Sequence, residues 1–243
     1  MLLRAAYPPS MLNRTAVVAL AMLVAGCSMS HGAAGPTVRE HRVVELDKSD
    51  LTRVSLDMSA GEIDVKGGAS NLLDADFSYN VPEWKPLVER TTSGTRADLK
   101  ITQGSSGINV GKTENHWQIA LNDAMPMEVT AHMGAGEATL ALGSLNLRKV
   151  DVHVGAGEVN VDLRGTPKAS YRVNIEGGVG EATVRVPANV AISATAAGII
   201  GEINVEGLEK RDGRWINPRT TSSPVTIELN VHGGIGEIRI IAG

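Results

Sequence analysis

Hydrophobic and polar residues alternate along the chain on both sides of a recurring glycine-rich tetrad. The tetrad has the form Gly-x-Gly-Glu, and two looser copies keep only the second glycine and the glutamate. The six copies end at Glu62, Glu137, Glu158, Glu181, Glu202 and Glu237. From Glu137 to Glu202 the glutamates are separated by 21, 23 and 21 residues. A period of this length is typical of proteins built from stacked structural repeats.

Alignment of the six copies on the glutamate assigns every second neighbouring residue to a core. Apolar residues stand eight and six positions before the glutamate and one and three positions after it, whereas the positions between them are mostly polar. In three copies these inward positions are Val150, Val152, Val159 and Val161; Val173, Ile175, Ala182 and Val184; and Ala194, Ala196, Ile203 and Val205. A period of two on each side of a turn predicts two strands per repeat, each with its apolar face inward.

We interpret the pattern as an all-β fold, a parallel β-solenoid with about 21–23 residues per rung. A hairpin also places two strands around a turn, but two-residue hairpin turns favour Asn-Gly or Asp-Gly over a repeated Gly-x-Gly. An antiparallel sandwich is the alternative fold. Two segments interrupt the period, an irregular part over residues 67–126 and a polar loop over residues 207–224. They contain all three tryptophans, which either pack on the solenoid or line a recognition surface.

The N-terminus has the features of an export signal. Residues 15–26, TAVVALAMLVAG, form an apolar stretch that matches a signal-peptide core and is too short to span a bilayer. It ends at Cys27, the only cysteine of the chain, in a context that resembles the lipobox of bacterial lipoproteins. We therefore expect residues 1–26 to be a signal peptide and Cys27 to be lipidated. A plain secretory signal is the alternative, and Met11 is a second candidate start.

The rest of the chain divides into a tether and one domain. Residues 28–41 are small, polar and unpatterned, so residues 27–42 are predicted to be the lipidated cysteine and a tether, and residues 43–243 a single solenoid domain. Several acyl chains give lasting attachment to a membrane. Ser28 rather than an aspartate after the cysteine favours the outer membrane over the inner one, if the cell has both.

Composition narrows the possible functions. Aromatic residues make up only 3% of the chain and there are 27 glycines, which indicates a narrow aliphatic core and many tight turns. The formal net charge of −4 and the lack of a basic patch argue against nucleic-acid binding. The sequence lacks a G-x-S-x-G nucleophile context, a zinc-protease motif and a phosphate-binding loop. We therefore predict a non-enzymatic protein without a cofactor.

One set of ionisable residues suggests chemistry at the turns. Histidines stand five positions before three of the glutamates, and the turn is expected to bring the two columns together at one edge. Imidazole and carboxylate groups are zinc-type ligands, although histidines also offset the charge of stacked glutamates. The candidate residues are His132, Glu137, His153, Glu158, His232 and Glu237. We expect this His/Glu edge to be structural, with a metal site as the alternative.

Parts of the sequence resemble a known family. The stretch from Trp117 to Pro126, the tetrads ending at Glu137 and Glu158 with their following strands, and the segment from Tyr79 to Trp84 are similar to the toast-rack family of bacterial envelope proteins. The similarity covers roughly residues 45–243. It implies an adhesin-like β-solenoid in the cell envelope; related membrane regulators of cell-wall stress carry transmembrane helices, which we do not expect here.

These observations lead to three functional hypotheses. The first is a membrane-anchored structural or binding module whose partner is an envelope protein or a glycan. The second is a metal- or pH-responsive sensor of envelope stress that uses the His/Glu edge. The third is a polysaccharide-active β-helix enzyme, although the outward columns are mostly Thr, Asn and Ser, rather than the clustered Asp, Arg or Lys such an enzyme needs.

Overall fold

The computed structural model describes residues 34–104, 112–220 and 223–243, which form strands and one short 3-10 helix. The predicted Cys27 lipidation site and the signal peptide lie outside these residues. In the described part no helix is long and apolar enough to cross a membrane. The elements in chain order are β1 (Val38–Val44), β2 (Leu51–Lys66), β3 (Leu73–Tyr79), η1 (Pro82–Trp84), β4 (Leu87–Ser93), β5 (Arg96–Thr102), β6 (Asn115–Leu121), β7 (Pro126–Ala141), β8 (Asn146–Asp162), β9 (Tyr171–Val186), β10 (Ala191–Glu206), β11 (Glu209–Arg211), β12 (Arg214–Ile216) and β13 (Thr226–Ala242).

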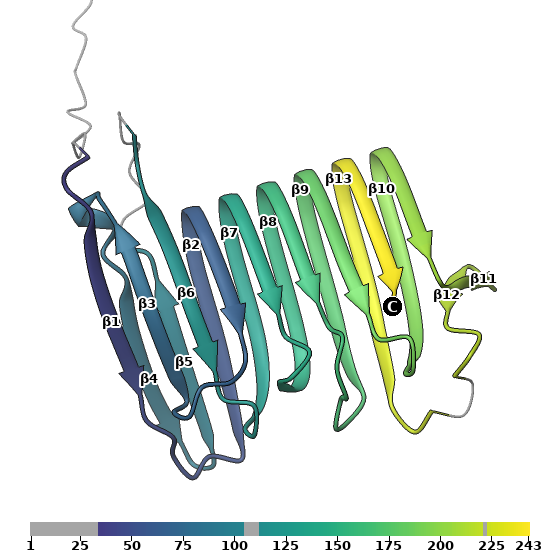
Figure 1. Ribbon diagram of the computed structural model, residues 1–243, viewed down its shortest axis with the longest axis horizontal. Coiled ribbons are helices and arrows are strands. Elements are labelled where there is room, and N and C mark those ends of the chain that lie inside the picture. Colours follow the sequence, from purple (N-terminus) through teal and green to yellow (C-terminus); the bar gives the residue numbers. More distant parts are fainter. Residues whose placement is uncertain (1–33, 105–111, 221–222) are drawn as a thin grey trace, which may run out of the picture. The chain divides into compact units, whose positions relative to one another are not determined.

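Six long strands form the rungs of a parallel β-solenoid, which confirms the predicted fold. Each of β2, β7, β8, β9, β10 and β13 is one continuous strand that folds back on itself at the tetrad, so that a rung has a first arm, an apex and a second arm (Figure 1). The rungs pair in parallel and in register, with Glu62 beside Glu137, Glu137 beside Glu158 and Glu158 beside Glu181. The predicted pair of strands per repeat is therefore a single bent strand.

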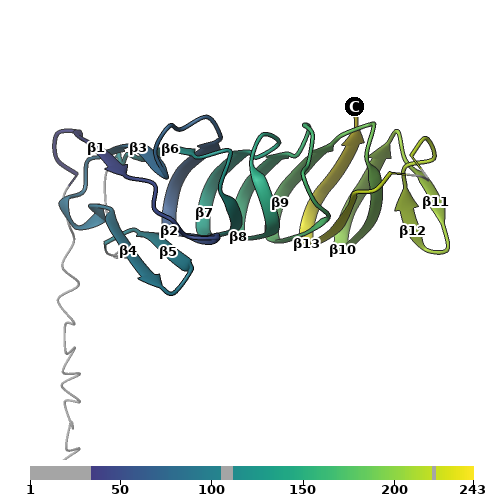
Figure 2. The same cartoon turned by 90° about the horizontal axis from the view of Figure 1, so that it is seen from below.

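The two arms belong to two facing layers of one folded sheet (Figure 2). In the first layer β4 and β5 extend the sheet beyond β2, and β12 and β11 extend it beyond β10. In the second layer β1, β3 and β6 continue beyond β2. The N-terminal interruption, residues 67–126, thus contributes strands to both layers.

The core lies between the two layers and follows the predicted register. Val150, Val152 and Val161 have no exposed surface, and Val159 is 2% exposed. Each side chain contacts the equivalent residue of the neighbouring rung, because in-register strands lie about 4.8 Å apart. Burial of aliphatic side chains, worth about 1.5–3 kcal/mol each, provides the main driving force for the stack. The described tryptophans belong to packing, since Trp117 and Trp84 are buried and Trp215 packs against the core.

The structure corrects three details of the sequence interpretation. The predicted tether, residues 27–42, is too long, because β1 starts at Val38 and pairs with β3 along its whole length. The predicted loop, residues 207–224, contains the β11–β12 hairpin, which turns at Asp212 and Gly213 with positive φ angles of 49° and 80°. The rungs do not stack in chain order, because β13 is inserted between β9 and β10.

Candidate functional site

The second glycine of each tetrad determines how the rung presents its side chains. Gly157 has a φ of 135°, a region that L-residues rarely adopt. A Cβ atom at this position would lie 1.8 Å from the backbone oxygen of Gly136 in the neighbouring rung. Only glycine allows this close approach. Because the backbone turns here, Glu158 points outward and Val159, the next residue, points into the core.

A row of ionisable side chains crosses the outer surface of the first layer. It occupies the position five residues before each glutamate, and we call it the histidine row: Asp57, His132, His153, Glu176 and His232. His132 Nδ1 lies 3.1 Å from Asp57 Oδ1, and His153 Nδ1 lies 3.1 Å from Glu176 Oε2. The two imidazole rings stack with centroids 4.9 Å apart and an interplanar angle of 15°.

The histidine row is accessible to solvent and contains both acidic and basic side chains. The His132 and His153 side chains are 52% and 39% exposed. Lys100 of β5 extends the row, with its Nζ 3.5 Å from Asp57 Oδ2. Ion pairs this exposed add little stability, about 0–1 kcal/mol each. The row therefore presents hydrogen-bond donors and acceptors to solvent, along a shallow groove whose walls include Gln103 and Met133.

A second row, which we call the glutamate row, crosses the outer surface of the second layer. It consists of the tetrad glutamates Glu62, Glu137, Glu158, Glu181, Glu237 and Glu202, named in spatial order. Glu158 accepts a hydrogen bond from Asn160 Nδ2 at 2.8 Å, and Glu237 accepts one from Asn204 Nδ2 at 3.0 Å. Hydrogen bonds from Asn204 and Arg239 lower the pKa of the Glu237 carboxyl below its usual value.

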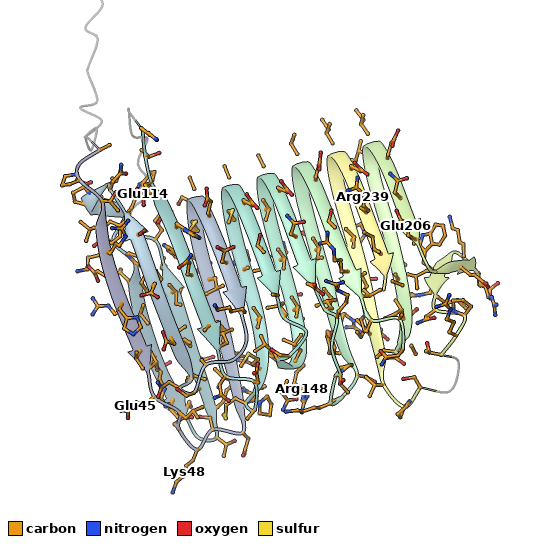
Figure 3. All side chains as sticks on the ribbon, viewed as in Figure 1. Glu45, Lys48, Glu114, Arg148, Glu206 and Arg239 are labelled. Atoms are coloured by element: carbon orange, nitrogen blue, oxygen red, sulfur yellow. The ribbon has the colours of Figure 1, made fainter. Side chains whose placement is uncertain are left out.

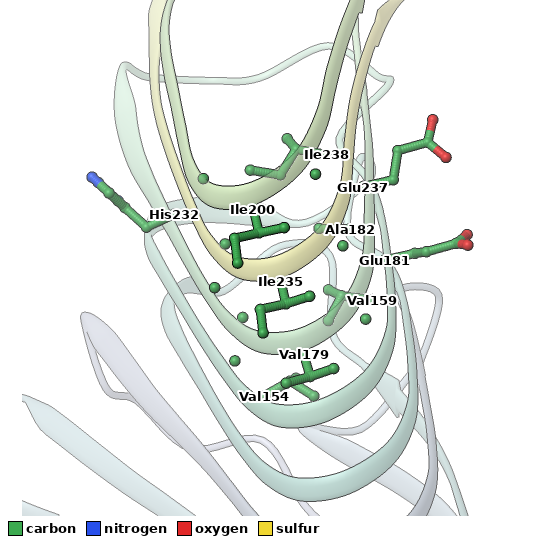
Figure 4. Close-up of a pocket in the computed structure, with 18 of the residues that line it drawn as sticks. Val154, Val159, Val179, Glu181, Ala182, Ile200, His232, Ile235, Glu237 and Ile238 are labelled. Carbon is green, nitrogen blue, oxygen red and sulfur yellow. The ribbon is translucent and has the colours of Figure 1, made fainter.

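The histidine and glutamate rows do not form the His/Glu edge that the sequence predicted. Figure 4 shows His232 and Glu237 pointing away from opposite sides of their rung. Within residues 34–104, 112–220 and 223–243 there is no group of three His, Cys, Asp or Glu side chains placed to hold a metal ion. His132 and His153 pair instead with Asp57 and Glu176, two members of their own column. Asp57 and Glu176 stand at the same aligned repeat position as the histidines, so this pairing could have been predicted from the sequence.

The apex of the last three rungs in the stack exposes aliphatic side chains. Val179, Ile235 and Ile200 occupy equivalent positions in β9, β13 and β10 and are 54%, 50% and 62% exposed. They point away from the bends, as do other apolar side chains above these rungs (Figures 3 and 4). We call these three residues together with Ile199, which is 83% exposed, the apical ridge.

Beneath the apical ridge the interior of the bend is hollow. The inward position before the apex is Gly177 in β9, Gly233 in β13 and Gly198 in β10. The resulting cavity has a volume of about 50 Å³ and is bordered by Val154 and Ile238. A space of this size holds at most a few water molecules and is far too small for a metabolite.

These features define a folded parallel β-solenoid with a filled aliphatic core and polar rows on its outer faces. The model of the N-terminal domain of toast_rack matches residues 33–185, so the chain belongs to the toast-rack family. A second model, of the C-terminal part of the LiaF protein of the response to cell wall-active antibiotics, matches residues 135–240. No curated protein sequence matches the chain.

One solved structure agrees with this assignment. A candidate cell adhesion protein from Clostridium sporogenes is 30% identical, with a TM-score of 0.82, and the alignment covers 86% of this chain and 100% of that chain. A candidate adhesin from Bacteroides fragilis is 12% identical with a TM-score of 0.33, over 86% of this chain and 99% of that one.

Proposed function

We propose that the protein is a non-enzymatic, lipid-anchored module of the bacterial cell envelope that binds a partner through its outer surface. The observation that supports this most directly is the combination of a filled interior with polar side chains repeated at rung spacing on both outer faces. Such a molecule offers an extended, regular surface. The adhesion-related relative from Clostridium sporogenes and the toast-rack family assignment agree with an envelope role.

Attachment through Cys27 is the first part of the proposal. Cys27 is the sole cysteine and follows an apolar stretch that ends in two small residues. The test is Cys27→Ser in the full chain, followed by mass spectrometry and membrane fractionation. We expect an unprocessed, non-acylated precursor. Normal processing and normal membrane retention of the variant would refute the anchor without affecting the binding surface.

The face that carries the histidine row is the proposed binding surface. Carboxylates and imidazoles share this row, so the same stripe donates and accepts hydrogen bonds, whereas the glutamate row mainly accepts them. The histidine row lies along a groove that His132 and Gln103 help to line. A polar ligand with hydroxyl groups or an extended polar peptide matches this arrangement, so the partner is an envelope glycan or protein.

Photo-crosslinking in intact envelopes tests the choice of face. A photoreactive amino acid replaces His153 in one variant and Glu158 in the other, since both residues lie on β8 but on opposite faces. We expect a discrete adduct from position 153 and none from position 158, followed by identification of the adduct. Equal labelling from both positions, or labelling from position 158 alone, would overturn the proposal.

A further inference from the structure

The stack ends in an open strand edge at β10. One side of β10 pairs with β13 from Ala191 to Glu206. On its other side, only Ser193 and Ala194 pair with a described strand, namely β12. The edge from Thr195 to Glu206 therefore presents backbone N–H and C=O groups to solvent, and such groups are a template for another strand. Ile203, assigned to the core by the repeat, is 41% exposed because no rung follows it in the described part of the chain.

The other end of the stack, which we call the closed end, has both arms of its rung β2 covered, although β1 and β4 each keep one edge unpaired among the described strands. β5 and β6 pair with the two arms of β2. Between them, Gln103 Oε1 accepts hydrogen bonds from Ser59 N at 2.9 Å and Ala60 N at 3.3 Å, and Asn115 Nδ2 donates to Ala60 O at 2.7 Å. The backbone of the β2 apex is thus satisfied by side chains. A second copy has no free rung at this end on which to stack head to tail.

The side chains of the β10 edge favour a second copy in the opposite strand direction. Position 197 is alanine, whereas the other five rungs carry an ionisable residue there. Parallel pairing of two β10 edges would turn the second copy over about the strand, so that the core face of one copy would continue into the outer face of the other. Antiparallel pairing about the apex keeps both core faces on the same side and places Glu202 opposite Ile199.

We propose that two copies of the chain associate through β10, antiparallel and around a two-fold axis at the apex. In this register Ile200 of one copy is opposite Gly201 of the other, Ala197 is opposite Asn204, and Thr195 is opposite Glu206. The same surface serves both copies, as closed two-fold association requires. This inference concerns self-association and stands independently of the proposed binding function.

The length of the free edge fits this register. On the first arm the edge is free up to Thr195, because β12 occupies Ser193 and Ala194. On the second arm β10 ends at Glu206, and Gly207 turns the chain away with a φ of 74°. The last residue of the second arm in one copy, Glu206, therefore lies opposite the first free residue of the first arm in the other copy, Thr195. The hairpin of one copy and the strand end of the other do not compete for the same edge.

The inward side chains complement one another across the same pairing. Gly198 and Ala196 of one copy come opposite Ile203 and Val205 of the other, so small residues face large ones. The partly exposed Ile203 would be covered, and the hollow bend would continue into that of the second copy. An interface of one strand edge and a few aliphatic side chains is at the small end of specific interfaces, so we expect association in the micromolar range.

Disulfide trapping in the full-length protein tests the register. Differently tagged copies carrying Ala197→Cys and Asn204→Cys are co-expressed and oxidised. Directly opposed residues of an antiparallel pair have Cα atoms about 4.5–5.5 Å apart, within disulfide range. The matched control is His153→Cys with Asn160→Cys, which occupy the same repeat positions in the internal rung β8. We expect a mixed dimer from the β10 pair and none from the control.

Three outcomes would overturn the proposal: no mixed dimer from the β10 pair, equal trapping in the control, or trapping of only like positions as in parallel pairing. A second measurement is sedimentation of the full chain in detergent, with Ile200→Lys as the variant. Ile200 is 62% exposed and tolerates lysine in the monomer, and lysine protects strand edges. We expect at least tenfold weaker association with an unchanged melting temperature. A wild-type protein that stays monomeric at high micromolar concentration would contradict the inference.

Discussion

The first three rungs of the stack and the last three share one repeat but differ beneath the bend. Met58, Met133 and Val154 fill the inward position before the apex in β2, β7 and β8, and all three are buried. The equivalent residues of β9, β13 and β10 are glycines, and their bends are hollow below an exposed apical ridge. The bends of the first three rungs are thus filled and the β2 apex is capped by side chains, whereas the last three rungs have hollow bends and β10 leaves most of one edge unpaired among the described strands.

The largest expected difference between the two sets of rungs is the loss of stability caused by a charge at the inward position directly after the tetrad glutamate. Val159→Asp places an unpaired carboxylate where the side chain is 2% exposed, and we expect a loss above about 4 kcal/mol and failure to fold. Ile203→Asp, at the same repeat position in β10, should cost about 1–2 kcal/mol because this site is 41% exposed. Urea unfolding measures both, and equal losses would show that β10 is covered.

Two adjacent glycines of β9 differ in the space around them. Gly177 borders the hollow bend, whereas Gly178 packs closely against the neighbouring rung. A Cβ at Gly178 would lie 2.2 Å from the backbone oxygen of Gly155, so Gly178→Ala should cost about 1–3 kcal/mol. A Cβ at Gly177 meets nothing within 4 Å, so Gly177→Ala should stabilise the protein by about 0.4–1 kcal/mol. Thermal unfolding of the two variants gives the comparison. A loss for Gly177→Ala would mean that the bend is narrower than described.

The closed end depends on the side-chain cap of the β2 apex. Gln103→Ala leaves the Ser59 and Ala60 N–H groups without their acceptor, and we expect a loss of about 1–2 kcal/mol. Gln103→Glu is the matched variant, because it keeps an acceptor oxygen. Hydrogen exchange at Ser59 and Ala60 should accelerate in the alanine variant only. Unchanged exchange in both variants would indicate that the cap contributes nothing to this end.

The smallest expected effect is an acid sensitivity of the closed end. Hydrogen bonding from Ser49 and the Arg90 guanidinium lowers the pKa of Asp47 to about 2. A carboxyl with a lowered pKa stabilises the folded state above its unfolded pKa near 4, and this contribution is lost as pH falls toward 2. Asp47→Asn should therefore cost less than about 1 kcal/mol at pH 6, and the difference from wild type should shrink between pH 4 and pH 2. A constant difference across this range would contradict the assignment.

Much of the fold follows from the repeat because a strand has a strict period of two. The burial of Val150, Val152, Val159 and Val161 and the lateral neighbours of Glu158 were predicted from the alignment and are confirmed. The place of β13 was not, because every rung carries the same pattern and so fits beside any other. The β11–β12 hairpin did have a local signal, the Asp212-Gly213 pair that suits a tight hairpin turn.

The site could be predicted only in part. His153 and Glu158 were expected to meet at one edge of the turn, but they point outward from two facing arms, and therefore in opposite directions. The expected His/Glu edge was wrong for this reason. Gln103 and Asn115 went unnoticed because they lie outside the repeats, where no periodic signal exists. The lipidation of Cys27 stays a prediction.

The insertion of β13 between β9 and β10 has a consequence for synthesis of the chain. Translation proceeds from the N-terminus, so residues 191–206 leave the ribosome before the strand that lies between them and β9 has been made. During that interval β10 can form only its short pairing with β12, and its place in the stack is available only when the last seventeen-residue strand, Thr226–Ala242, has been made. A chain cut short before Thr226 therefore lacks an interior rung rather than the last one. Because β13 pairs with both β9 and β10, the C-terminal strand is what attaches β10 to the rest of the stack.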